Sequence, residues 1–553
     1  MSEVDSTNET ANKARACPSW GSLTFARVLE KWATSRGDVP FLQPNGGPAL
    51  TFANVQSDVV RIANVLRAQG FGPGDSMLLR AGRRPEGLIM LLAAIKAGLQ
   101  VCLAPEGMSA RQVTEGAVSY APKLAIDAGT PSQDRPESLR ILEMAANLFT
   151  IRFVGCFGEA PDGFVDLASI DAPPMDDSAL PSINPDQDAV VHVLRHSAEG
   201  KLERLSRTQN QLLAQALACA MISDLSVNSR IGTAFDPIGA HGLLTTALPA
   251  LLVGCGVQLF EAVDPSLDAR LQLWLGESDT HRLVLPAAFA NAVGFKAETT
   301  KAKRIWVSNG PASHAVPKGD HLLVDCGGAA LVPASQNNQG QTQMRPGAIT
   351  IGLPNGAAMT FGTLRLEGGA QENSTSGTLM TGEICLDSPL VAARNGKLLH
   401  PQPTGQTARL AENDERRPVY VLTDADAAAV QVGAHRVMLS VINRALGLTG
   451  RWQDAAVFSV PDPLMQNRIE VAVEPRAGDG EAQTLPTLDM VRRMLLESGI
   501  GDAGLPVKIH LVTRVPRRGR GVVDIAALPD HIWEAPPPLE DDEDEIGVQA
   551  AVA

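Results

Sequence analysis

The chain has 553 residues, of which 44% are hydrophobic and 20% are charged, and these values are typical of a globular protein with more than one domain. Its net charge of −14 combines 47 basic with 61 acidic residues, and six of the acidic residues form one run at positions 540–545. This balance, together with only 4% aromatic residues, argues against nucleic-acid binding.

Cysteine spacing and hydropathy indicate the compartment. The seven cysteines lie far apart without a Cys-x-x-Cys pair, which suits reduced thiols better than disulfides or a zinc site. Residues 1–16 are polar, and the most apolar stretches are interrupted by Lys96 or Pro249, so we expect no membrane span. The sequence therefore predicts a cytoplasmic protein.

Predicted helices and strands alternate through the first part of the chain. A helix begins after Thr51, where apolar residues recur at helical spacing, and Gly70 ends it. The next predicted elements are a strand at 76–81, a helix at 85–97, strands at 99–104 and 123–127, a helix at 137–148 and a strand at 151–155. Such alternation predicts parallel α/β layers.

The pattern changes further along the chain. Residues 171–188, rich in Pro, Asp and Ser, are predicted to link two α/β halves. Short strand patterns with a Pro-Asn-Gly turn signal predict an antiparallel β subdomain at about 345–415. The elements expected after it are helices at 437–446 and 488–498 and strands at 455–460, 468–473 and 507–513.

The predicted fold is α/β. A large N-terminal domain, residues 21–418, is expected to combine two α/β layered subdomains with the small antiparallel β subdomain. A small mobile α+β C-terminal domain is expected at 419–530. Residues 1–20 and the Pro-rich, acidic residues 531–553 are predicted to be disordered.

Several short strings, in order along the chain, carry a resemblance to a known family. They are Leu50-Thr51-Phe52, Gly72-Pro73-Gly74-Asp75, Ala93-Ala94-Ile95-Lys96-Ala97-Gly98, Ala455-Ala456-Val457, Pro461-Asp462-Pro463 and residues 516–528. Together they resemble the adenylate-forming superfamily, which includes acyl-CoA synthetases, peptide-synthetase adenylation domains and luciferases, over about residues 23–528. The resemblance implies a reaction in which ATP converts an acid to an acyl-adenylate before a thiol accepts the acyl group.

The family's phosphate-binding loop reads roughly T-S-G-S-T-G-x-P-K-G, and its counterpart here is residues 195–204. By this resemblance Ser197, Gly200 and Lys201 are the candidates for nucleotide contact. Glu203 stands where the family has its lysine, and a carboxylate there is expected to repel phosphate.

The family's Y-G-x-T-E segment supplies a stacking aromatic residue and the carboxylate that holds magnesium. It corresponds here to residues 326–330, in which Ala330 replaces the carboxylate. Gly327 and Gly328, with Gly310 upstream, remain candidates for nucleotide contact.

Three more positions follow from the resemblance. Gln406 replaces the aspartate that holds the ribose in the family's T-G-D segment. Arg436 fits a G-x-R-V string near the predicted domain junction. The adenylating lysine position is occupied by Val522, and Arg520 beside it is a candidate cation.

Some features leave alternatives open. His241 and Gly242 are candidates for the substrate pocket, although His241 is also consistent with a hydrogen-bonded structural histidine. Cys326, a third pocket candidate, is either a nucleophile on a turn or a buried thiol. A cluster of arginines near the C-terminus has three interpretations: it is a solvated loop, it binds the phosphates of CoA, or it pairs with the acidic tail. It comprises Arg514, Arg517, Arg518 and Arg520.

The leading interpretation is a catalytically impaired acyl-CoA synthetase-like protein. It would bind an acyl or acyl-thioester ligand between Pro237 and Gly328, or act on an active ligase or an acyl carrier protein, and no cofactor is expected. The alternative is a divergent but active acid–thiol ligase that uses ATP, Mg²⁺ and CoA, with Lys201 and Arg520 supplying cations. A third possibility is thioester chemistry at Cys326.

Overall fold

The structure is a computed structural model. It describes residues 23–532 apart from 45–46, 81, 105–107, 109, 129–135, 159, 172–187, 197–201, 234, 261–280, 288–301, 310–315, 318, 329, 353–357, 375–376, 400, 424–428, 433–434, 449–450, 463–465, 477–485 and 519–522. The predicted terminal segment 1–20, residues 533–553 of the predicted segment 531–553, and nearly all of the predicted linker lie outside the described residues. His531 ends the 3₁₀ turn of residues 525–531.

The described residues form two large sheets, of which one has eight strands in the order β20-β9-β8-β4-β3-β5-β6-β7. The strands are β3 (Ser76–Arg80), β4 (Gln100–Leu103), β5 (Leu124–Asp127), β6 (Phe153–Cys156), β7 (Val165–Asp166), β8 (Ala189–His196), β9 (Leu202–Thr208) and β20 (Ala393–Arg394). The central strands β3, β4, β5 and β6 pair in parallel, which confirms the predicted layer.

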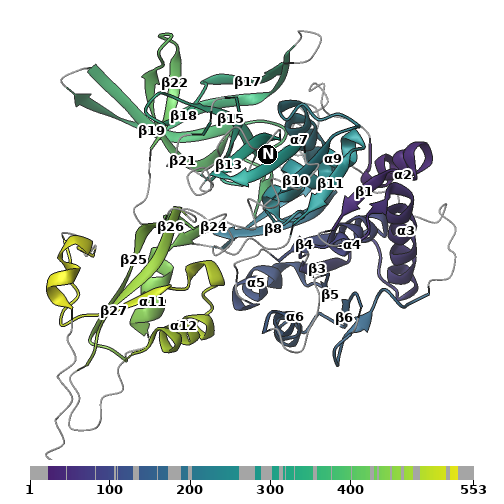
Figure 1. Cartoon of the computed structure of the whole chain (residues 1–553), viewed down its shortest axis with the longest axis horizontal. Helices are drawn as coiled ribbons and strands as arrows, with labels where there is room; N and C mark the ends of the chain where they lie inside the picture. Colours follow the sequence, from purple (N-terminus) through teal and green to yellow (C-terminus); the bar gives the residue numbers. More distant parts are fainter. Residues whose placement is uncertain are drawn as a thin grey trace, which may run out of the picture.

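Helices pack beside this sheet (Figure 1). They are α2 (Phe25–Arg36), α3 (Phe52–Ala68), α4 (Pro85–Lys96), α5 (Ala110–Ala117) and α6 (Pro136–Asn147), with a 3₁₀ turn η1 (Val118–Tyr120). A capping box starts α3: the Thr51 hydroxyl accepts from Asn54 N at 3.2 Å, and Thr51 N donates to Asn54 Oδ1 at 3.1 Å. The α4 helix begins at a proline, as predicted.

The other large sheet has 14 strands in the order β17-β18-β19-β21-β22-β16-β15-β14-β13-β12-β10-β11-β1-β2. Its strands on the parallel side are β1 (Pro40–Gln43), β2 (Leu50–Thr51), β10 (Arg230–Thr233), β11 (Gly256–Leu259), β12 (Arg282–Pro286), β13 (Lys303–Ser308) and β14 (His321–Asp325). Beside it lie α7 (Gln209–Ile222), α8 (Ala240–Gly242), the π-helical turn η3 (Leu243–Ala247) and α9 (Leu248–Val253).

The predicted antiparallel strands continue this same sheet instead of forming a layer of their own. They are β15 (Leu331–Gln336), β16 (Thr342–Met344), β17 (Gly347–Gly352), β18 (Ala358–Ser374), β19 (Gly377–Asp387), β21 (Gln402–Glu412) and β22 (Pro418–Thr423). The connection is made by β14, which pairs in parallel with β13 and antiparallel with β15. The antiparallel strands were therefore predicted correctly, and the structure adds that β14 and β15 join them to the parallel strands.

The C-terminal unit contains the hairpin β23 (Ala429–Val432) and β24 (His435–Met438), the sheet β25 (Asp454–Asp462), β26 (Gln466–Glu474) and β27 (Lys508–Leu511), helices α11 (Leu439–Leu448) and α12 (Leu488–Glu497), and 3₁₀ turns η5 (Asp502–Gly504) and η7 (Ile525–His531). The helix expected from Val437 starts later, because Val437 pairs with Val430 in the hairpin. The β-branched side chains favour that ladder over a helical start.

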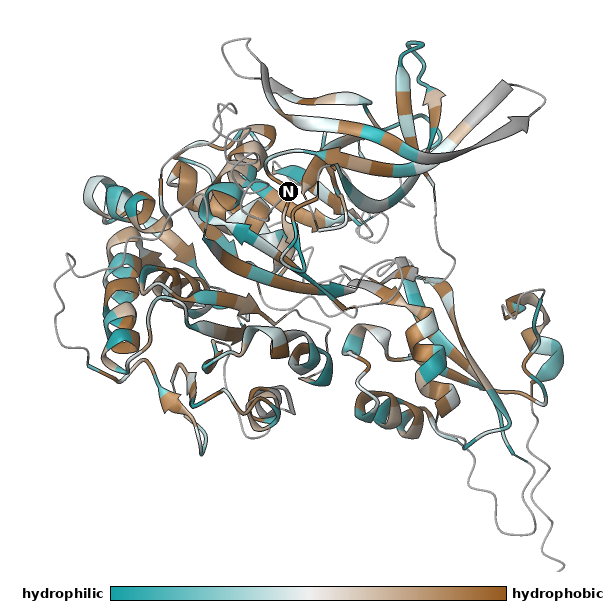
Figure 2. Ribbon diagram, turned by 180° about the vertical axis from the view of Figure 1, so that it is seen from behind, coloured by the Kyte–Doolittle hydropathy of each residue, from teal (hydrophilic) through white to brown (hydrophobic). Residues whose placement is uncertain are grey.

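Hydrophobic residues are frequent on the helices and strands of these layers (Figure 2), and their buried side chains form clusters. One large cluster joins the parallel parts of both large sheets, and Phe41 stacks on Phe52 in it with ring centroids 4.4 Å apart. A separate cluster fills the C-terminal unit around Ile442, Leu446 and Val471. None of the helices in the described residues is long and apolar enough to cross a membrane.

Candidate functional site

A cavity of about 270 Å³ is lined by residues of both large sheets and of the C-terminal unit. The β8–β9 hairpin, the segment around α8 and the turn after β14 supply its polar groups. The C-terminal unit supplies mainly apolar side chains, among them Val437, Met438, Val441, Ile442 and Ile500.

The β8–β9 hairpin places charged side chains toward this cavity. Because side chains alternate along a strand, Glu203, Leu205 and Arg207 share one face of β9, and Arg195 faces Glu203 across the ladder. Leu205, Arg207 and Arg195 all line the cavity.

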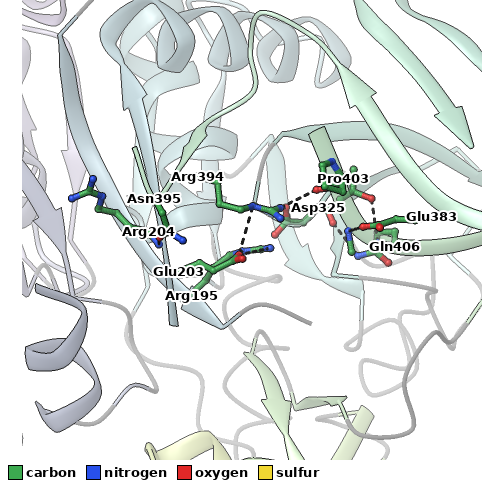
Figure 3. A network of polar contacts seen from close by, with 12 residues as sticks. Arg195, Glu203, Arg204, Asp325, Glu383, Arg394, Asn395, Pro403 and Gln406 are labelled. Atoms are coloured by element: carbon green, nitrogen blue, oxygen red, sulfur yellow. Dashed lines mark hydrogen bonds and ion pairs between the residues drawn. The ribbon is translucent and has the colours of Figure 1, made fainter. Parts of the chain in front are cut away.

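Glu203 is bound by two guanidinium groups (Figure 3). Arg195 Nη2 lies 3.2 Å from Glu203 Oε2, and Arg394 Nε lies 3.6 Å from the same oxygen. The charge of Glu203 is therefore offset by two cations inside the protein.

Arg207 is a buried cation that sequence reasoning missed. Arg207 is only 4% exposed, and its Nη2 donates a hydrogen bond to the carbonyl oxygen of Gly328. Burial lowers the pKa of Arg207 to about 10, although the Asp325 carboxylate opposes the fall. Arg207 thus remains cationic at neutral pH. The available signal was an arginine at an inward position of an otherwise buried strand segment, where an unpaired charge is costly.

Asp325, at the end of β14, accepts hydrogen bonds at both carboxylate oxygens. His241 Nε2 lies 3.0 Å from Oδ2, and Gly328 N donates to Oδ1 at 2.5 Å. Burial alone would raise the pKa of Asp325, but the hydrogen bond and charge of His241, with Arg195 and the Gly328 N–H, hold it below its usual value. Sequence reasoning did not single out Asp325 and missed its place in the site.

Two glycines make the turn after β14 possible. Gly327 and Gly328 have φ of +63° and +69°, in the left-handed region. A Cβ on Gly327 would lie 2.0 Å from the carbonyl oxygen of Thr404, and one on Gly328 would lie 2.3 Å from Leu205 Cδ1. Because Gly327 has no Cβ, the segment that contains Thr404 and Gln406 can lie against the turn.

Gln406 uses its side-chain amide within the protein. Its Nε2 donates to the carbonyl oxygens of Asn309 at 2.7 Å and Asp325 at 3.3 Å, and the residue is 4% exposed. Ala330, also 4% exposed, packs in an apolar cluster with Val332 and Met344.

The cavity brings together six of the predicted positions, namely His241, Gly242, Gly327, Gly328, Ala330 and Gln406. Cys326 is not among its lining residues and is fully buried, so the prediction that it lies in the substrate pocket is wrong. Burial also raises the pKa of the Cys326 thiol far above its usual value, and the nearby Asp325 carboxylate adds to the effect. A protonated, buried thiol is a poor nucleophile, and this argues against thioester chemistry at Cys326.

Other predicted positions are not placed by the structure. Ser197, Gly200, Lys201, Gly310, Arg520 and Val522 lie outside the described residues, and for Arg436 only the backbone, in β24, is described.

Two members of the C-terminal arginine cluster bind carboxylates of their own unit. Arg517 lies 2.8 Å from Asp454, and Arg518 lies 2.8 Å from Asp524. These contacts favour a surface loop over a grip on CoA phosphates.

The described residues do not fit a magnesium–nucleotide complex at the positions that the resemblance implies. Ala330 offers no oxygen ligand, and the amide of Gln406 already binds two backbone carbonyls. In the described residues no group of three or more His, Cys, Asp or Glu side chains is arranged to hold a metal ion.

Comparisons with known proteins agree on one family. The sequence model of the AMP-binding enzyme family matches residues 29–191. A probable 2-succinylbenzoate–CoA ligase of Mycobacterium tuberculosis is 24% identical over 327 residues, which cover 56% of this chain and 79% of that protein. The salicyl-AMP ligase / salicyl-S-ArCP synthetase of the same species is 25% identical over 352 residues, 61% of this chain and 57% of that protein.

The fold is also that of solved structures. The amide bond synthetase McbA from Marinactinospora thermotolerans superimposes with a TM-score of 0.66 at 14% identity, covering 92% of this chain and 99% of the other.

Proposed function

Since the chain is a member of the adenylate-forming superfamily, with a fold and an AMP-binding segment like those of acyl- and aryl-CoA ligases, we propose that it is a catalytically impaired relative that binds an acyl or aryl ligand. The observation that carries this proposal is Gln406. At the position where the resemblance implies a ribose-binding carboxylate, its amide nitrogen Nε2 donates to the carbonyls of Asn309 and Asp325.

The cavity suits a small acid or its thioester. Its volume of about 270 Å³ lies just below the range of about 300–1,000 Å³ that is usual for small-ligand pockets, so a small ligand fits best. Arg195 and Arg207 contribute polar groups, and the C-terminal unit contributes an apolar wall. Two of the relatives are named for aromatic acyl groups, 2-succinylbenzoate and salicyl, so aryl acids are the first candidates.

A partner role is part of the same proposal. The protein would present its bound acyl group to an active ligase or to an acyl carrier protein, and the name of one relative includes transfer to such a carrier. Co-purification of the full chain with a ligand-loaded carrier protein, compared with the unloaded carrier, tests this role.

One observation favours a second candidate, an active but divergent acid–thiol ligase. Arg83, Arg195 and Arg207 line the cavity, and cations there could meet phosphate charge in place of the family's lysines. Under this candidate ATP, Mg²⁺ and CoA are the cofactors, and Lys201 and Arg520 are further cations.

Calorimetric titration of the full chain with Mg·ATP and with AMP separates the two candidates. The proposal expects no saturable heat with either nucleotide up to millimolar concentration, but saturable binding of aryl acids. Nucleotide binding followed by acid-dependent pyrophosphate release would establish the ligase. In that case Lys201→Ala and Arg520→Ala should each abolish turnover.

A further inference from the structure

His241 and Asp325 form a hydrogen-bonded pair at the wall of the cavity. His241 Nε2 lies 3.0 Å from Asp325 Oδ2, and the two side chains keep 15% and 16% of their exposure. With the Nε2 hydrogen directed at the carboxylate, a neutral imidazole holds its lone pair on Nδ1. Both residues line the cavity, so a bound molecule can meet this imidazole.

Asp325 is equipped to fix the imidazole and to stabilise its protonated form. Its hydrogen bond from His241 and the Arg195 charge keep its pKa low in spite of burial, so it stays ionised at neutral pH. A buried carboxylate that accepts from one imidazole nitrogen orients the ring and favours proton uptake at the other nitrogen.

Gly328 connects this pair to a buried cation. Its N–H donates to Asp325 Oδ1 at 2.5 Å, and its carbonyl accepts from Arg207 Nη2. The turn therefore holds Arg207 next to the His241–Asp325 pair. A fixed cation at such a place stabilises negative charge that develops on a carbonyl oxygen.

A water molecule can serve as the nucleophile beside the His241 imidazole. The described residues that line the cavity include no serine, threonine or cysteine, and the Cys326 thiol is buried outside it. A base and a cation are present, so the missing component of a hydrolytic reaction is a water molecule.

We propose that the cavity hydrolyses a small acyl or aryl thioester, with His241 as general base and Asp325 as its positioning residue. The inference rests on the proposed function, because that function supplies the bound thioester.

In the first step the water oxygen attacks the carbonyl carbon while His241 Nδ1 takes a water proton, and the carbonyl electron pair moves to the oxygen beside Arg207. In the second step the C–S bond breaks and the sulfur receives the proton from Nδ1. The products are the carboxylic acid and the thiol, and the neutral imidazole is restored. Water is the one co-reactant.

The test uses the full chain with the benzoyl and octanoyl thioesters of N-acetylcysteamine, and thiol release is followed colorimetrically. We expect hydrolysis above the buffer rate. His241→Gln should reduce the rate by about 10²- to 10⁴-fold. Asp325→Asn should reduce the rate and alter the pH profile. Calorimetry with the amide analogue of each thioester, in which nitrogen replaces the sulfur, should show that both variants still bind this ligand.

The chain offers a matched control. His510 and Glu470 form a similar histidine–carboxylate pair in the C-terminal unit, with His510 Nε2 2.6 Å from Glu470 Oε2, and neither residue lines the cavity. His510→Gln should leave the rate unchanged.

The outcomes separate this inference from the function on which it rests. If the amide binds but the thioester stays intact, the hydrolysis is overturned while ligand binding stands. If neither amide nor thioester binds, both proposals fail. If folded His241→Gln or His241→Asn variants, checked by thermal melting, hydrolyse as fast as the wild type, His241 is a structural histidine and the inference is wrong.

Discussion

Glu203 and Arg195 face each other across the β8–β9 ladder, with the guanidinium Nη2 3.2 Å from the carboxylate Oε2. Arg394 belongs to β20, which pairs with β9 but is distant from it in sequence, and its Nε lies 3.6 Å from the same oxygen. One carboxylate thus holds two guanidinium groups together. The charge at this position is a structural element of the hairpin, even though the resemblance implies a lysine there.

This relationship predicts the result of a charge reversal. Glu203→Lys leaves Arg195, Arg394 and the new lysine together in a largely buried place, so we expect a loss of about 3–5 kcal/mol in the free energy of unfolding, measured with urea. Glu415→Lys is the control, because Glu415 and Arg417 form an exposed pair and the change should stay within about 0.5 kcal/mol. Equal stability of Glu203→Lys and the wild type would show that the pair does not exist.

Gly327 gives a second test on the turn that carries the site. Gly327→Ala places a Cβ 2.0 Å from Thr404 O in addition to the strain of a positive φ, so it should destabilise the protein more than Gly340→Ala. Gly340 also has a positive φ, but a Cβ there meets nothing within 4 Å. We expect about 1 kcal/mol for Gly340→Ala and clearly more for Gly327→Ala, by urea unfolding. A reversed order would contradict the turn geometry.

His192 makes stability depend on pH. Burial and the nearby Arg204 lower the pKa of His192 from 6.5 to about 3. In the folded protein its Nδ1 lies 2.8 Å from Ser206 Oγ and its Nε2 lies 3.1 Å from Gln100 Oε1. Between these two values the unfolded chain binds a proton that the folded protein does not, so stability falls as pH decreases from 6.5 toward about 3.

The measurement for His192 is the urea midpoint as a function of pH. His192→Gln should show a shallower decline than the wild type between pH 6.5 and about 3, and the two curves should run parallel above pH 6.5. Identical slopes over the acidic range would show that His192 titrates equally in both states.

Cysteine labelling tests the burial of the thiols. Cys326 and the other five cysteines of the described residues are buried, and burial raises the pKa of Cys326, Cys219 and Cys102, so iodoacetamide should not modify them in the native protein at pH 7.5. Mass spectrometry after native labelling checks this, and labelling in urea is the positive control. Rapid modification of Cys326 in the native state would show that Cys326 is a reactive thiol, contrary to this prediction.

The sequence allowed the local elements to be predicted where capping and periodicity act over a few residues. Thr51 and Asn54 start α3, and Pro85 starts α4, because these signals depend on neighbouring residues alone. Sheet membership depends on distant pairing, and for that reason the continuation from β14 into β15 was not predicted.

The candidate site was predictable only in part. The resemblance pointed to His241, Gly327, Gly328 and Gln406, which do line the cavity. The partners that give these residues their chemistry come from distant segments: Asp325 binds a histidine 84 positions away, and Arg207 binds Gly328, 121 positions away. Local patterns in a single sequence contain no signal for such pairs.

The apolar wall supplied by β24, α11 and η5 has a consequence for binding energetics. A ligand that fills the cavity contacts the N-terminal sheets and the C-terminal unit at once, so occupancy and the position of that unit are thermodynamically linked. A ligand that packs against both parts therefore stabilises the contact between them, and Val441→Asp, which places a carboxylate in the apolar wall, should weaken the binding of an apolar ligand.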